Sequence, residues 1–248
     1  MAKKKPKTPP PPRRVQAPQR RVDPKSPTDL IARQRALLYG IAGAGIVALV
    51  VVVLVIVLGG GSGSGADDKK IAAAMTKAGC TYKTVKAYVP PGQGVHVASL
   101  TKKFPWNTTP PSNGQHYPVW AVWNFYTEAV NPRMIVHNEE HGGVILWWGS
   151  KVPQSTVDRL NAFYREQPVG VVGTPYPSLG SKVAISAWTG DPAKYGRVKG
   201  YYGFGHLGIC PSYTDQTEKA FATFRSAYRG HGPEGISLDA DKPGMGPS

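Results

Sequence analysis

The sequence predicts an α+β domain with a mostly antiparallel sheet and about three helices, preceded by one transmembrane helix and a disordered N-terminal tail. Three observations lead to this prediction. Residues 37–58 form a run of 22 residues without a charge, long enough to cross a bilayer once. Residues 1–29 are rich in Lys, Arg and Pro and nearly devoid of apolar side chains. Beyond residue 66, short helix-like and strand-like segments alternate, separated by Gly, Pro and polar residues.

The N-terminal tail, residues 1–36, carries 11 Lys or Arg against two Asp. Basic residues beside a crossing are retained in the cytoplasm, so we expect the N-terminus to lie inside. Such a tail is attracted to anionic lipids, which explains its charge without a nucleic-acid partner.

The apolar run 37–58 is interpreted as an uncleaved anchor. A cleaved signal peptide is the rival, but its apolar run has about 7 to 15 residues, and this one is longer and ends in glycines. A Gly/Ser linker, residues 59–66, then leads to an extracytoplasmic globular domain, residues 67–234, and a flexible C-terminal tail, residues 235–248. We therefore expect a single-pass protein of the cell membrane, with the lipid bilayer and an unknown envelope protein as partners.

Hydrophobic periodicity places the elements of this domain. Helical spacing and capping-box pairs predict three helices, at residues 67–77, 155–166 and 215–228. In the second of these helices the capping pair is Ser155 and Asp158, and in the third it is Asp215 and Glu218. Runs of β-branched and aromatic residues predict six strands, at residues 82–89, 119–126, 144–148, 169–172, 183–188 and 197–202.

Both cysteines, Cys80 and Cys210, lie beyond the apolar run. In an oxidising compartment a disulfide between them is favoured. Thiolate metal ligands and free thiols remain alternatives, because the sequence does not show whether the two Cα atoms approach each other.

Four of the six histidines, His96, His116, His137 and His141, fall within 46 residues. His137, Glu140 and His141 have the H-x-x-E-H spacing of inverted zinc proteases. Gly142 and Gly143 follow directly, so we expect at most one helical turn there, too little for such a protease. In a turn His137 and His141 would still converge, whereas in a strand their Cα atoms would lie roughly 13 Å apart.

A transition-metal site is the leading hypothesis. His96 and His116 lie in Gly- and Pro-rich segments, where loops often carry functional groups. Joined to the other two histidines, with Glu139 or Glu140 as a fourth or orienting ligand, they would suit zinc or copper. Met134 is a further candidate ligand. The alternative is a hydrogen-bonded network without metal, in a structural or protein-interaction module of the envelope.

The sequence leaves other functions of the domain open. Seven aromatic residues between residues 104 and 126 could stack on a sugar or a peptide if exposed, although core packing is their commoner use. The sequence has no P-loop, nucleophile elbow or paired-cysteine zinc motif, which argues against nucleotide-driven and serine-hydrolase chemistry. We expect a non-enzymatic role for the metal site, and the further alternative, a metal-dependent hydrolase, would need Glu140 as its base.

Three segments, TTPPSNGQHYPVWAVWNFY, VHNEEHGGVILWW and AYRGHGPE, resemble the bacterial family called domain of unknown function 3105. The resemblance extends over about residues 79–234. Asn113 and Gln115 stand where the family often has Ser and Pro, and neither is a candidate ligand. The resemblance implies a membrane-anchored or exported protein, frequently actinobacterial, and no established activity.

Overall fold

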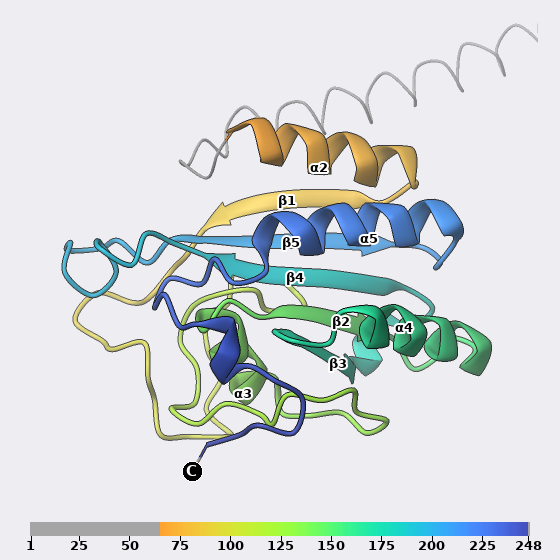
Figure 1. The fold of residues 1–248 in the computed structure, drawn as a ribbon. Coiled ribbons are helices and arrows are strands. Elements are labelled where there is room, and N and C mark those ends of the chain that lie inside the picture. The colour runs from red at the N-terminus through yellow and green to blue at the C-terminus, as the bar shows by residue number, and fades with distance from the viewer. Residues whose placement is uncertain (1–64, 248) are drawn as a thin grey trace, which may run out of the picture. The chain divides into compact units, whose positions relative to one another are not determined.

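In the computed structural model, which describes residues 65–247, five strands form one sheet in the order β1-β5-β4-β2-β3 (Figure 1). Neighbouring strands are antiparallel except β2 and β3, which are parallel. The predicted α+β class is confirmed, and the sheet is mixed. In chain order the elements are α2 (Gly65–Lys77), β1 (Thr81–Lys86), α3 (Pro132–Glu140), β2 (Val144–Trp148), α4 (Gln154–Glu166), β3 (Val171–Pro175), η1 (Pro177–Leu179), β4 (Val183–Thr189), β5 (Phe204–Cys210), α5 (Asp215–Tyr228) and η2 (Leu238–Ala240).

The sheet separates two sets of packed side chains. Successive residues of a strand point to opposite faces, so Leu146 joins the core formed with α2, α4 and α5, while Ile145 and Trp147 join the core on the side of α3. All five residues of β2 are buried, which explains why this strand is an unbroken apolar run. Figure 1 shows α2, α4 and α5 over the same face of the sheet. The long segment between β1 and α3 contributes to the opposite side.

The three predicted helices are confirmed as α2, α4 and α5, although two of their caps differ. The N-cap of α4 is Pro153, without a side-chain hydrogen bond, and the N-cap of α5 is Thr214, whose hydroxyl accepts from the amide of Thr217. The expected capping boxes at Ser155 and Asp215 therefore lie one or two residues inside the helices.

A fourth helix, α3, occupies residues for which at most one turn was expected. Its start follows known rules, because the Asn131 side chain accepts from the amide of Arg133, and Pro132 occupies the first position, where no backbone donor is needed. The helix ends at Glu140 because Gly142 has a φ of 106°, which a residue with a side chain rarely adopts. The expectation of a single turn was wrong.

Two predicted strands were also wrong. Residues 119–126 form a loop that touches the sheet through one bridge, between Phe125 and Gly173. Residues 197–202 form an exposed turn region, and the strand lies just beyond it as β5. The sequence pattern did not predict β5 because this strand contains Gly205 and Gly208, and glycine has low strand propensity. A Cβ at Gly208 would lie 2.8 Å from the end of the Met75 side chain, so glycine lets this side chain pack closely against the strand.

Cys80 and Cys210 form a disulfide, as predicted, with Cα atoms 4.2 Å apart. The bridge joins the residue before β1 to the last residue of β5, so the edge strand β1 is tied covalently to its neighbour.

The two ends of the chain differ in what can be described. The predicted basic tail, apolar run and most of the linker, residues 1–64, lie outside the described residues. Among the described helices none is long and apolar enough to span a bilayer. The C-terminal segment, expected to be a flexible tail, packs against the domain: Asp241 is fully buried, and Trp123 exchanges backbone hydrogen bonds with Gly244 and Met245.

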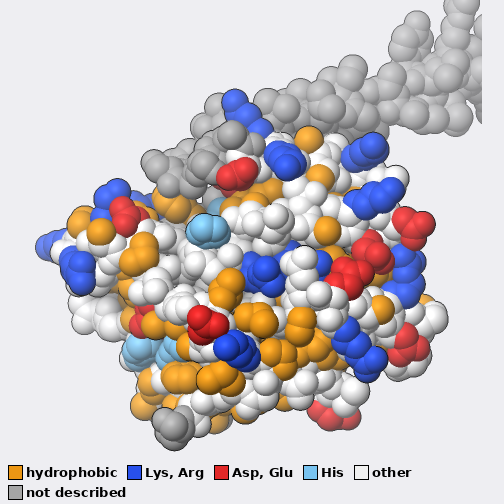
Figure 2. Space-filling view, viewed as in Figure 1, with side chains coloured by type: hydrophobic (Ala, Val, Ile, Leu, Met, Phe, Trp, Pro, Cys, Tyr) orange, Lys and Arg blue, Asp and Glu red, His pale blue; other side chains and the backbone are white. Residues whose placement is uncertain are grey.

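On the face that carries α2, α4 and α5, Lys and Arg side chains are interspersed with Asp and Glu (Figure 2). This face therefore has no single patch of one sign.

Candidate metal centre

His96 and His116 lie side by side on the segment between β1 and α3. The amide of His116 donates to the Val95 carbonyl at 2.9 Å, and the amide of Val97 donates to the His116 carbonyl at 2.8 Å, which makes a short parallel bridge. Gly114 has a φ of 99°, and a Cβ there would lie 2.9 Å from the Tyr88 carbonyl oxygen, so glycine is needed to turn the chain into His116.

Polar side chains of the same segment are buried and hold its shape. Asn113 accepts from the Tyr88 amide at 3.2 Å, and Gln115 donates to Gln93 and to the Gly94 carbonyl, each at 3.0 Å. Both side chains therefore stabilise the segment around His116.

Helix α3 supplies the other ligand candidates. His137 and Glu140 are three residues apart and therefore share a face of the helix, and His141 is its C-cap. Asn138 points elsewhere: its side chain exchanges two hydrogen bonds with the backbone of Ala121, at 3.0 and 2.8 Å, which fixes the helix against the preceding loop.

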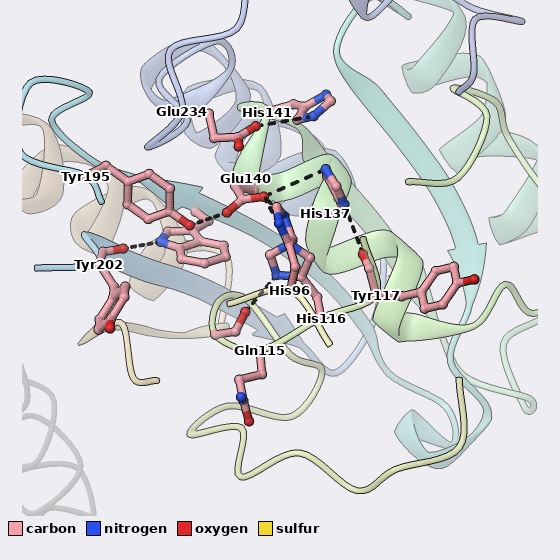
Figure 3. Close-up of polar contacts among 12 residues, drawn as sticks. His96, Gln115, His116, Tyr117, His137, Glu140, His141, Tyr195, Tyr202 and Glu234 are labelled. Carbon is pink, nitrogen blue, oxygen red and sulfur yellow. Dashed lines mark hydrogen bonds and ion pairs between the residues drawn. The ribbon is translucent and has the colours of Figure 1, made fainter. Parts of the chain in front are cut away.

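Three imidazoles surround one carboxylate oxygen (Figure 3). Glu140 Oε2 lies 3.0 Å from His116 Nε2, 3.1 Å from His96 Nε2 and 3.8 Å from His137 Nε2. The ligand atoms of these four residues all lie within 4.8 Å of one another. The sequence indicated that histidines and a glutamate could converge here. In the structure His96 and His116 lie beside His137 and Glu140 of α3.

Backbone carbonyls orient the two buried rings. His116 Nδ1 lies 2.8 Å from the Gly114 oxygen, and His137 Nδ1 lies 2.9 Å from the Tyr117 oxygen. A carbonyl oxygen can only accept, so Nδ1 carries the proton in both rings and each Nε2 faces Glu140. The remaining oxygen of Glu140, Oε1, accepts from the Tyr195 hydroxyl (Figure 3).

The centre is buried but has an edge open to solvent. His116 and Glu140 side chains are fully buried, whereas the His96 side chain is 40% exposed. Burial and the neighbouring His116 lower the pKa of His137 to about 4. Burial would raise the pKa of Glu140, but the contacts with His116 and His96 outweigh it and hold this pKa below its usual range. The contact with Glu140 raises the pKa of His96.

His141 belongs to a neighbouring group. Its Nε2 lies 3.4 Å from Glu234 Oε2, and its Nδ1 lies 3.7 Å from Asp241 Oδ1. His137, His141 and Glu234 also have ligand atoms within 4.8 Å of one another. The Trp120 ring covers both histidines, with centroids 5.3 Å from His137 and 4.7 Å from His141.

Two predicted ligand alternatives, Glu139 and Met134, contact other parts of the fold. Glu139 points away from the centre into the core, where it accepts from Ser186 at 2.5 Å, and burial raises its pKa well above the ordinary value. Met134 packs with the apolar cluster around Ile135. The choice between Glu139 and Glu140 thus falls on Glu140, because only that residue shares a helix face with His137.

Sequence reasoning missed Tyr195, Glu234 and Asp241, which lie far along the chain from the histidines. Glu234 stands in the AYRGHGPE segment, so the resemblance was the one signal for it. Nothing in the sequence distinguishes Tyr195 from the other tyrosines.

The model of the family described as Protein of unknown function (DUF3105) matches residues 96–235. The chain belongs to the DUF3105 family. The matched range begins at His96 and includes Glu234, so it contains every member of both ligand groups. Neither a curated protein nor a solved structure matches this DUF3105 chain.

Proposed function

We propose that this DUF3105 domain binds one transition-metal ion, zinc or copper, through His96, His116, His137 and Glu140. The role is non-enzymatic, because the carboxylate that a hydrolase would need as a base is itself a ligand.

The observation that carries the proposal is the direction of two lone pairs. Because Nδ1 of His116 and of His137 donates to a carbonyl, a neutral ring offers an Nε2 lone pair to the carboxylate of Glu140. Two acceptors that face each other without a proton or a cation between them repel. A metal ion among the four atoms turns each of these contacts into a favourable one.

The spacing suits such an ion. Metal–ligand bonds of about 2.0 to 2.1 Å in a tetrahedron place the ligand atoms roughly 3.3 Å apart. The distances from Glu140 Oε2 to the three Nε2 atoms, 3.0 to 3.8 Å, bracket this value. Hydrogen bonds from buried His Nδ1 atoms to carbonyls, and from Tyr195 to Glu140, are the kind of support that orients metal ligands.

The same proposal places the domain outside the cytoplasm, held by the apolar run 37–58, with the basic tail against anionic lipids of the inner leaflet. The Cys80–Cys210 disulfide supports this location, because disulfides persist mainly in oxidising compartments. Protease added to intact cells should then digest the domain and spare the tail.

The test measures metal in the full-length chain purified in detergent. Elemental analysis should find about one zinc or copper per chain. In His96→Gln, which alters the most exposed ligand, affinity should fall by at least the roughly 10- to 100-fold typical of losing a residue that only orients a ligand. His231→Gln is the matched control, because His231 is exposed and belongs to neither ligand group.

A wild-type chain that contains no metal and takes none up would refute the proposal. The cluster would then be a structural network, as in an interaction module, and His96→Gln would change thermal stability equally with and without added metal.

A further inference from the structure

Next to the proposed ligands of the first ion, the His141 side chain faces two carboxylates. Its Nε2 lies 3.4 Å from Glu234 Oε2, near the roughly 3.3 Å expected between ligands that share one tetrahedral ion. On its other side, Nδ1 lies 3.7 Å from Asp241 Oδ1. Figure 3 shows Glu234 beside His141 at the end of α3.

Buried atoms in this group lack hydrogen-bond partners. His141 Nδ1 and both carboxylate oxygens of Asp241 have none, although Asp241 is fully buried and His141 is 7% exposed. Buried charged groups are costly unless they are paired. A small shift would join Asp241 to His141 Nδ1, and the Nε2 lone pair would then face Glu234, as in a carboxylate–histidine–metal arrangement.

We propose that His141 and Glu234, with Asp241 behind the ring, form a second divalent-cation position beside the first, so that the chain binds two ions at saturation. This inference rests on the proposed function. His137 is within reach of both positions, but its Nδ1 is bound to the Tyr117 carbonyl and only Nε2 is free. One nitrogen lone pair coordinates one ion, so His137 completes the first position and leaves two protein ligands at the second.

The second position is therefore the weaker one. Water would complete its coordination, and the Glu234 side chain is 28% exposed, so solvent has access. The backbone nevertheless presets its geometry: Gly230 donates to the Gly142 carbonyl at 2.9 Å and Glu234 donates to the Glu140 carbonyl at 3.4 Å, which holds Glu234 against the end of α3.

The experiment titrates zinc into the metal-depleted full-length chain in detergent and counts bound equivalents by calorimetry and elemental analysis. The wild type should bind two, one tightly and one weakly. Glu234→Gln should lose the weak equivalent and keep the tight one. Glu128→Gln, which alters an exposed glutamate outside both ligand groups, should keep both.

His141→Gln provides a second arm, with circular dichroism and melting curves to confirm that each variant is folded. It should also lose only the weak equivalent, whereas His96→Gln should weaken only the tight one. A wild type that binds one equivalent, unchanged in Glu234→Gln and weakened in His96→Gln, would overturn this inference and leave the first site standing. The inference also fails if Glu234→Gln still binds two ions, or loses both while folded. A wild type that binds none would overturn the proposed function itself.

Discussion

Replacing Gly232 by Ala should detach the C-terminal segment from the end of α3. An added Cβ would overlap the Gly142 amide nitrogen and the Glu140 carbonyl oxygen, and would lie 2.5 Å from the His141 carbonyl carbon. All of these atoms belong to the backbone, so no side chain can rotate to make room. The segment must therefore move away.

The structure sets the size of the effect. Moving the segment weakens two backbone hydrogen bonds, Gly230 to Gly142 and Glu234 to Glu140, at about 1 kcal/mol each. Overpacking at a tight contact adds about 1 to 3 kcal/mol. We expect Gly232→Ala to lower the free energy of unfolding by about 3 to 5 kcal/mol.

Urea denaturation of the full-length chain would measure this loss. Gly94→Ala is the matched control, because the nearest atoms to its added Cβ lie at ordinary distances of 3.8 and 4.0 Å, and it should stay within about 0.5 kcal/mol of the wild type. If Gly232→Ala were as stable as Gly94→Ala, the backbone contact would not hold the segment in place, and the reasoning would be refuted.

Three further outcomes are expected. Tyr195→Phe removes the donor to Glu140 Oε1, so metal affinity should fall about 10- to 100-fold in a binding titration while the melting temperature changes little. Burial lowers the pKa of His206 to about 3, below the roughly 6.5 of an unfolded chain, so the unfolded state binds the extra proton as the pH falls. The free energy of unfolding should therefore fall below about pH 6.5, by up to about 1.4 kcal/mol per pH unit. Urea denaturation at several pH values should show that the unfolding free energy of His206→Gln depends less steeply on pH than that of the wild type. Replacing Cys80 and Cys210 together by Ser should lower the unfolding free energy by about 2 to 5 kcal/mol, and an unchanged urea midpoint would contradict this.

Sequence reasoning succeeded where one local pattern dominates. The strand Val144–Trp148 is buried on both faces, and its sequence is an unbroken apolar run. In the helix Asp215–Tyr228, buried side chains recur every three or four residues along one face. Both elements were predicted at these limits. Tertiary packing decided β5 and α3. β5 contains glycines whose neighbours lie very close, and α3 is short and ends in polar residues that face other parts of the fold, so neither has a clear periodic pattern of its own.

The sequence predicted the residue types of the candidate site. It did not predict that these residues divide into two groups. Clustering along the chain singled out four histidines and Glu140. The sequence could not show that His141 faces Glu234 and Asp241 and does not join the group around Glu140. That division depends on the docking of residues 230–241, about a hundred positions later in the chain, and no local pattern encodes such a contact.

The order in which the ligands occur along the chain has a consequence for synthesis. The four residues of the first group lie between residues 96 and 140, whereas Glu234 and Asp241 follow about a hundred positions later. Chains emerge from the ribosome N-terminus first. A growing chain therefore carries the complete first group before residues 234 and 241 have been made, and the group around His141 can form only at a later stage of synthesis.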